Sequence, residues 1–367
     1  MNEVSYIVVF PTEFSKKNIP QLINNIKKIL KIQKQEFKKI SRDGDIILVD
    51  ANDPVFASSA INLLFGIKEI AIARKIQNNF NEIVNQITSI GGNLLLKGEK
   101  FYVKVEGTSR GFLAKDVEIA STSSIIEKKS NLGAVPGTEN NFDKLLYTYL
   151  TKNNAYVCIF SDSGKRGIPF VQDESKNVIC AVFDEVSAIS CYETIKQGFR
   201  TKIIVCYGNK NELMNLAKMI IHIIPRLLEE RIEIEFFNIK VNYSVKNYLK
   251  INQIAIQILL KFNESHISLP LSPLIFPQRF IDESLKIIFS QNKIPILPLS
   301  GVDSELILDS RELLLESSFK KIEKLNFSKY DVQLPNETEI QDICKKGKKI
   351  MLKIGPNNLH DILDAFE

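Results

Sequence analysis

Apolar and polar positions alternate in two different ways along this 367-residue chain. In the first part, short apolar runs and amphipathic stretches follow one another without a regular order, which predicts two small α+β units. The expected strands are residues 4–10, 44–51, 68–75, 101–106 and 155–160. The expected helices are residues 19–40, 54–64, 79–90 and 115–129.

The alternation of strand-like and helical stretches becomes regular from residue 177 onward. Gly198, Pro225 and Asn263 mark the ends of the helical stretches. Such regular alternation predicts a parallel sheet with helices on both faces, which binds ligands at the carboxyl ends of its strands. The polar segment 161–177 is the expected linker between the two parts. The strands expected in this sheet are residues 177–183, 201–207, 232–237, 266–271 and 294–299.

Composition narrows the class of protein. Hydrophobic residues make up 44% of the chain and no apolar run is long enough to span a membrane, so a globular protein without a membrane partner is expected. The first residues do not resemble a secretory signal. An odd number of cysteines without a C-x-x-C pair argues against structural zinc and favours a reducing cytoplasm. The cysteines are Cys158, Cys180, Cys191, Cys206 and Cys344.

The net charge of +5 is small, but basic residues gather between positions 27 and 42, where Glu36 is the only acid before the end of the run. Four of the lysines recur at helical spacing, with Ile23, Ile26 and Leu30 available for an inner face. Two interpretations stay open: a solvated helix surface, or a basic stripe that faces phosphates. The lysines at helical spacing are Lys27, Lys31, Lys34 and Lys38.

Several segments, in their order along the chain, resemble the tRNA 4-thiouridine synthetases (tRNA sulfurtransferases). The segments are "LLFGIKEIAIARKI" (63–76), "GEKFYVKVEGTSRGFLAKDVEI" (98–119), "SGKRGIPFVQDESKNVICAVF" (163–183) and "IPILPLSGVDSELILDSREL" (294–313). The resemblance implies a chain of class α/β and α+β. Its expected parts are a ferredoxin-like N-terminal domain (1–76), a THUMP RNA-binding domain (77–170), a Rossmann-like PP-loop pyrophosphatase domain (171–325) and a C-terminal tail (326–367).

The nucleotide-binding loop of that family, Ser-Gly-Gly-x-Asp-Ser, follows the first strand of the pyrophosphatase domain. The similar "SGVDS" at 300–304 follows the fifth strand, so Asp303 is expected to cap a helix instead. A phosphate cradle needs glycines, because the backbone must turn through positive φ and bring its N–H groups close to the phosphate. The corresponding position here has no glycine and carries two carboxylates. It comprises Phe183, Asp184, Glu185, Val186, Ser187 and Ala188.

These departures predict a non-catalytic relative with no cofactor and no metal. The family's later Thr-Gly-Glu-x-x-Gly-Gln segment would fall at "SLPLSPLIFPQ" (268–278), where its glycines and glutamate are missing. Of the cysteines, Cys344 alone has a polar, basic setting that would lower its pKa. His222 stands in an apolar run and is expected to be packed. The alternative is an active ATP-dependent sulfurtransferase, in which Asp184 and Glu185 act through Mg²⁺ and Cys344 or another protein carries sulfur.

The resemblance also implies a partner, tRNA or structured RNA, bound by the first two domains. Glu106 and Gly107 stand where the family has a Lys-Arg pair, which predicts fewer phosphate contacts. A third hypothesis is a THUMP adaptor for a separate RNA-modifying enzyme, or a ribosome-associated factor. Because the family includes dimers, a homodimer is a further expectation. Besides the lysines of the 27–42 run, the implied RNA contacts are Arg74, Lys75, Lys104, Arg110, Lys115, Lys165 and Arg166.

Overall fold

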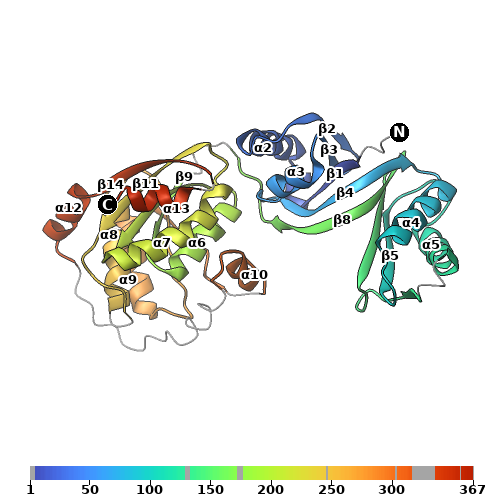
Figure 1. Ribbon diagram of the computed structural model, residues 1–367. Helices are drawn as coiled ribbons and strands as arrows, with labels where there is room; N and C mark the ends of the chain where they lie inside the picture. Colours follow the sequence, from blue (N-terminus) through green and yellow to red (C-terminus); the bar gives the residue numbers. More distant parts are fainter. Residues whose placement is uncertain are drawn as a thin grey trace. The chain divides into compact units, whose positions relative to one another are not determined.

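The chain forms two compact units, Met1–Gly167 and Ile168–Glu367, in a computed structural model (Figure 1). The structure describes residues 5–128, 133–171, 177–244, 247–301, 304–315, 335–355 and 357–366. Within these ranges, no helix is long and apolar enough to cross a membrane. Each unit is considered by itself.

An eight-stranded sheet forms the first unit, with the strand order β2-β3-β1-β4-β8-β7-β5-β6. The strands are β1 (Ser5–Pro11), β2 (Phe37–Asp43), β3 (Ile46–Ala51), β4 (Ile67–Gln77), β5 (Lys100–Gly107), β6 (Val135–Pro136), β7 (Lys144–Leu150) and β8 (Asn154–Arg166). The helices are α1 (Glu13–Lys16), α2 (Ile19–Ile32), α3 (Pro54–Ile61), α4 (Phe80–Leu94) and α5 (Ala114–Lys128).

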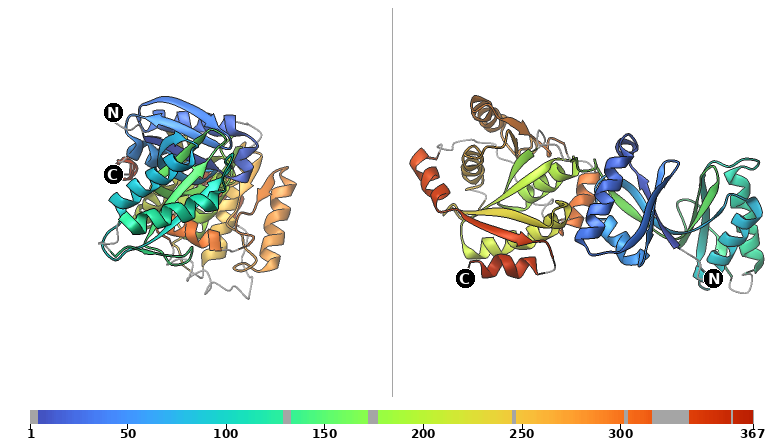
Figure 2. Two further views of the ribbon diagram at one scale, coloured as in Figure 1. Left: turned by 90° about the vertical axis from the view of Figure 1, so that its right-hand side faces the viewer. Right: turned by 90° about the horizontal axis from the view of Figure 1, so that it is seen from above.

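The long antiparallel pair β4 and β8 joins the two predicted N-terminal regions into one sheet. Ile67 pairs with Arg166 at one end of this ladder, and Gln77 pairs with Asn154 at the other. The boundary predicted at residues 76 and 77 therefore coincides with the last residues of β4. Helices α4 and α5 lie side by side, as Figures 1 and 2 show, with α5 against β5 and α4 against β4, β7 and β8. The apolar positions of β5 are buried in the core that these helices share with the sheet.

On the opposite face of this sheet, side chains from different strands pack against one another. The Phe10 ring of β1 contacts Tyr147 and Tyr149 of β7, with ring centroids 5.8 and 5.2 Å apart. The Oδ2 atom of Asp43 accepts hydrogen bonds from the Tyr156 hydroxyl at 2.5 Å and from the side chains of Thr151 and Asn154. Side chains far apart in sequence thus hold the strands β1 and β2 to β7 and β8.

Three sequence expectations for the first unit were wrong. The helix expected at 19–40 ends at Ile32, because Lys34 adopts a left-handed turn (φ 54°) and residues from Phe37 pair with β3 as an edge strand. The strands β6 and β7 were not expected. The linker expected from residue 161 starts later, since residues 161–166 extend β8 and pair with β4.

The second unit contains the predicted parallel sheet, in the order β13-β12-β9-β10-β11-β14. The strands are β9 (Asn177–Val182), β10 (Arg200–Tyr207), β11 (Arg231–Asn238), β12 (His266–Ser268), β13 (Ile294–Ile296) and β14 (Lys348–Lys353). The helices are α6 (Glu185–Lys196), α7 (Lys210–Ile223), α8 (Tyr248–Leu259), α9 (Gln278–Ser290), α10 (Ser304–Glu312), α12 (Glu337–Lys345) and α13 (Asn358–Asp364).

The helices of the second unit end where the sequence indicated. Gly198 follows α6 with a φ of +85°, Pro225 lies in a 3-10 turn after α7, and Asn263 follows α8. The helix α10 begins at Ser304, whereas Asp303, the expected cap, lies outside the described residues. The strands β9 to β13 are parallel, and this confirms the fold class.

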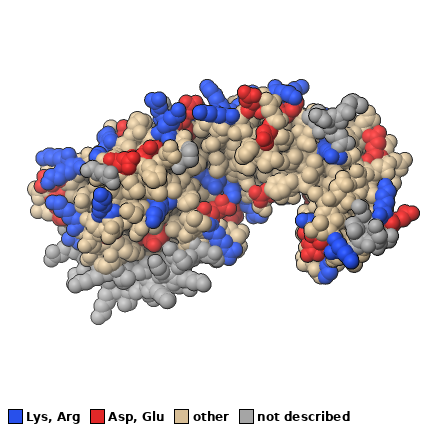
Figure 3. Space-filling view, in the orientation of Figure 1, with Lys and Arg blue, Asp and Glu red and all other residues tan. Residues whose placement is uncertain are grey.

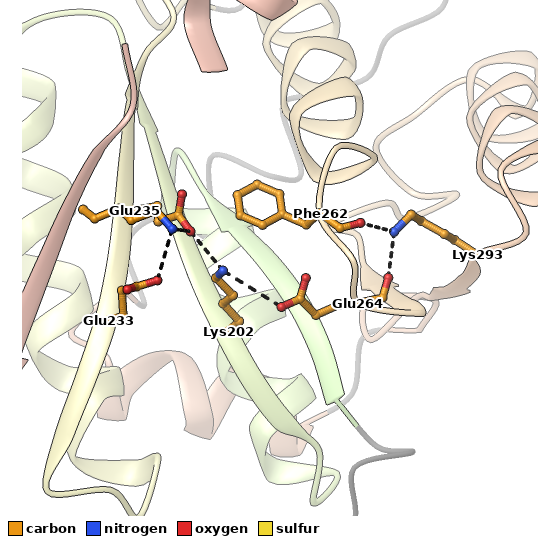
Figure 4. A network of polar contacts seen from close by, with 7 residues as sticks. Lys202, Glu233, Glu235, Phe262, Glu264 and Lys293 are labelled. Atoms are coloured by element: carbon orange, nitrogen blue, oxygen red, sulfur yellow. Dashed lines mark hydrogen bonds and ion pairs between the residues drawn. The ribbon is translucent and has the colours of Figure 1, made fainter. Parts of the chain in front are cut away.

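The C-terminal residues, whose role the sequence did not show, complete the sheet. The strand β14 pairs antiparallel with β11, and Glu235 lies opposite Lys349 in this pairing. The buried Glu235 carboxylate holds Lys202 of β10 at 2.9 Å and Lys349 of β14 at 3.2 Å (Figure 4). This charge cluster therefore links the edge strand β14 to its neighbour β11 and to β10 beyond it.

We expect Glu235→Ala to lower the free energy of unfolding by about 2 kcal/mol, because the partly buried Lys202 loses its counter-charge, whereas the mostly exposed Lys349 is solvated by water. Glu233→Ala is the matched control, since Glu233 contacts the same Lys349 at 3.6 Å but is far more exposed. Its expected cost is below ~1 kcal/mol. Urea unfolding of the two variants measures both values, and equal losses would contradict the role given to Glu235.

Candidate functional site

The connection between β9 and α6 lies where the resemblance places a nucleotide-binding loop, and it is a closed capping box. The Oδ1 atom of Asp184 accepts hydrogen bonds from the Ser187 backbone N–H at 2.8 Å and from the Ser187 hydroxyl at 2.6 Å. The Ser187 Oγ atom accepts the backbone N–H groups of Phe183 at 2.8 Å and Asp184 at 2.9 Å. Asp184 and Ser187 are 3% and 1% exposed.

This capping box occupies the position that an anion would need. The N-terminus of a helix attracts anions through its unpaired N–H groups and its positive dipole end. Here a carboxylate and a hydroxyl of the chain itself already accept two of those N–H groups, from Asp184 and Ser187, and also the N–H of Phe183 just before the helix. A phosphate at this position would have to displace the buried Asp184 side chain.

Burial raises the pKa of Asp184 to about 6, although the hydrogen bonds from Ser187 lower it. The second carboxylate oxygen, Oδ2, is buried, and among the described residues it has no hydrogen-bond partner at normal geometry. The nearby Tyr248 hydroxyl lowers the pKa of Asp184. Above this pKa the carboxylate is ionised. The site then presents a negative charge at the end of the central strand.

A cavity of about 470 Å³ opens beside this loop, at the carboxyl ends of the strands. The loop contributes Phe183, Asp184 and Glu185 to its lining. The remaining lining comes from three other segments: Glu212, Asn215, Leu216, Lys218, Met219 and His222 of α7, Tyr243 after β11, and Leu313, Leu314 and Leu315 after α10. The prediction that His222 is packed in the core was wrong, because its half-buried ring faces this cavity.

Glu212 ties two of the loops around the cavity together. Its carboxylate accepts the backbone N–H of Gly208 at 2.8 Å and that of Tyr243 at 2.8 Å. It also accepts the side-chain amide of Asn209 at 2.9 Å. The rim formed by the β10–α7 and β11–α8 connections is therefore rigidly built.

Polar contacts with α6 hold α10, which carries the apolar wall of the cavity. The buried Lys196 ammonium contacts Glu305 at 2.7 Å and also Asp309. Burial and the neighbouring Asp309 raise the pKa of Glu193 to about 8, so this glutamate holds a proton at pH 7. These contacts fix the residues Leu313 to Leu315 that follow the helix.

The cysteines show no activated thiol. Cys158, Cys180, Cys191 and Cys206 are buried, as three of the apolar runs around them indicated. The expectation that its basic setting lowers the pKa of Cys344 was wrong: burial raises this pKa and outweighs the charge of Lys261. Among the described residues, no group of three or more His, Cys, Asp or Glu side chains could hold a metal ion.

The basic residues predicted to contact RNA do not form a single stripe. Lys27 and Lys31 lie on the exposed face of α2, Lys34 lies in the turn after it, and Lys38 lies on the edge strand β2. Figure 3 shows Lys and Arg side chains over α2 and β2, with acidic side chains between them. Arg74 and Lys75 belong to β4, Lys165 and Arg166 to the end of β8, and Arg110 to the β5–α5 connection.

Two of the predicted contacts are already paired with acids. Lys104 contacts Glu106 at 2.9 Å, and Lys115 contacts Glu118 at 2.8 Å. The first unit nevertheless keeps a basic excess, since residues 1–167 carry 23 Lys and Arg against 17 Asp and Glu. Residues 168–367 carry 25 against 26. The positive charge of the chain is thus a property of the first unit.

The fold is shared with solved structures, although no protein-family model and no curated protein matches this chain. A 4-thiouridine synthetase, solved as an RNA complex with bound ATP, superposes with a TM-score of 0.63 at 12% identity. The match covers 95% of this chain and all (100%) of that one. PH1313 from Pyrococcus horikoshii superposes with a TM-score of 0.61 at 17% identity, covering 84% of this chain and 99% of that one. These likenesses show the fold, of the thiouridine-synthetase type.

We expect Asp184→Asn to change how stability depends on pH. The pKa of Asp184 is higher in the folded state, about 6, than the ordinary 3.8, so folding favours the protonated form. The free energy of unfolding of the wild type should therefore fall, relative to the variant, by on the order of 3 kcal/mol as pH rises from 4 to 6.5. Asparagine keeps an oxygen that can cap the helix.

Urea unfolding at a series of pH values between 4 and 7.5 measures this difference. The control is Asp53→Asn, because Asp53 caps α3 with the same kind of hydrogen bonds but is exposed to water. A change of the same size in Asp53→Asn would show that helix capping, and not burial, produces the effect. A level difference for Asp184→Asn would show that burial does not perturb this carboxyl group.

Proposed function

We propose that this protein binds structured RNA, with tRNA as the expected species, and that it does not use ATP at the β9–α6 loop. The RNA part of the proposal is supported by the fold match over 95% of the chain to a thiouridine synthetase whose structure contains RNA. The basic excess of residues 1–167 supports the first unit as the RNA-binding part, since phosphate contacts dominate such affinity.

The observation that carries the second part is the capping box. A triphosphate needs free N–H groups and a glycine-bearing turn, whereas Asp184 and Ser187 fill this helix terminus from within. Placing a phosphate ~4 Å from an ionised carboxylate would add a repulsion of about 1–4 kcal/mol. The thiols do not support sulfur transfer either, because burial raises the pKa of Cys344.

We expect the double variant Lys27→Glu/Lys31→Glu to bind a tRNA transcript about tenfold or more weakly at 0.1 M salt. If both lysines contact phosphates, the slope of log affinity against log salt should fall by up to ~1.8. The matched control is Lys286→Glu/Lys353→Glu in the second unit, which changes the net charge equally. Fluorescence anisotropy of labelled tRNA measures both properties.

An equal loss in the two double variants would contradict RNA docking on α2 and indicate a non-specific charge effect. No RNA binding by the wild type would overturn the RNA part of the proposal. The ATP part is tested separately by equilibrium dialysis with Mg·ATP, with and without tRNA. Saturable binding at or below millimolar ATP, lost in Asp184→Ala/Glu185→Ala, would overturn it.

A further inference from the structure

The cavity beside Asp184 keeps the size and the place of a ligand site although its phosphate-binding position is filled. Its volume of about 470 Å³ lies within the range of small-molecule sites. It opens at the carboxyl ends of parallel strands, where such sheets bind ligands. A site of this kind raises the question of which chemistry it accepts.

The charge of the lining favours cations over anions. Asp184 and Glu185 bring two carboxylates to the cavity, and a third, that of Glu212, already accepts hydrogen bonds from Gly208, Asn209 and Tyr243. Burial raises the pKa of Tyr243, which also lines the cavity, and the charges of Asp184 and Glu185 raise it further, so the phenol lies within their field. Lys218, the cation of the lining, is exposed, so water screens its charge.

The opposite wall is apolar and contains a strained residue. Leu314 has a φ of 59°, in a helix-ending turn where glycine is the usual residue. In this turn the backbone N–H of Leu315 donates to Ser310 at 2.7 Å and that of Leu314 donates to Arg311 at 2.9 Å. The Leu314 side chain is 75% exposed at the cavity. The turn therefore presents an apolar side chain to the cavity.

We propose that this cavity binds a small organic cation: an ammonium group on a flat apolar body, without phosphate. The ammonium lies against the carboxylates of the β9–α6 connection, and the apolar body lies between Met219 of α7 and the Leu313–Leu315 wall. Charge-assisted hydrogen bonds to a partly buried carboxylate make the cavity selective for a cation. Contact between the apolar body and the apolar wall provides the remaining affinity. This inference rests on the proposed absence of ATP from the same site.

The test uses three probes with one phenyl body and different head groups, titrated into the full chain by calorimetry. These probes are phenethylamine, 2-phenylethanol and 3-phenylpropionate. We expect phenethylamine to bind about tenfold more tightly than the alcohol, and the carboxylate not to saturate. Equal affinities for the amine and the alcohol, or saturable binding of the carboxylate, would overturn the proposal.

Two variants locate the site. Glu185→Gln should weaken phenethylamine about tenfold and leave 2-phenylethanol unchanged, because it removes charge and keeps shape. The control is Glu229→Gln, since Glu229 lines a separate cavity of about 250 Å³ at the amino ends of the strands. Equal effects of the two variants would overturn this site for the amine.

Leu314→Gly separates a binding role from a structural one. Glycine relieves the positive φ and should raise the unfolding midpoint, while loss of the leucine side chain should weaken phenethylamine about fivefold. If the variant is more stable but binds phenethylamine as tightly as the wild type does, Leu314 does not contribute to the binding site. Mg·ATP titrated into the same samples tells the two proposals apart: saturable ATP binding overturns the proposed function, whereas failure of phenethylamine alone overturns only this inference.

Discussion

The hydrogen bonds between Asp184 and Ser187 determine what the second unit can do. They join the central strand β9 to α6 and satisfy N–H groups that would otherwise face the carboxyl end of the sheet. Both side chains are almost fully buried. An anion could therefore bind at this connection only if the hydrogen bonds between Asp184 and Ser187 were broken and their polar groups were exposed. The carboxyl end of the sheet thus carries a capped helix terminus beside a cavity.

The first unit depends on a different constraint, the long pairing of β4 with β8. This ladder carries the helices of both N-terminal regions on one sheet, and the Asp43 contacts with Thr151, Asn154 and Tyr156 join the edge strand β2 to the start of β8. A rigid sheet of this kind keeps the basic residues of α2, β4 and β8 in fixed positions within the unit. Such fixed positions matter for RNA, which proteins recognise largely through backbone charge and shape.

The sequence predicted the parallel sheet correctly, because alternating apolar strands and amphipathic helices with clear end signals are local features. It failed where long-range contacts decide. The lysine spacing of residues 27–38 suits a helix, yet the Lys34 turn and the pairing of β2 with β3 convert its second half into strand. Similarly, β14 depends on Glu235 and on the edge of β11, which no local pattern in the C-terminal residues indicates.

The candidate site likewise depends partly on local sequence features and partly on long-range contacts. The missing glycines at 183–188 predicted a changed loop, and the composition of that segment was sufficient for the inference. The cavity itself was not predictable, since its walls come from α7, the residues after β11 and the residues after α10. The contacts of Lys196 with Glu305 and Asp309 help to place the last wall against the first. The cavity therefore depends on packing between segments far apart in the sequence, which no local pattern indicates.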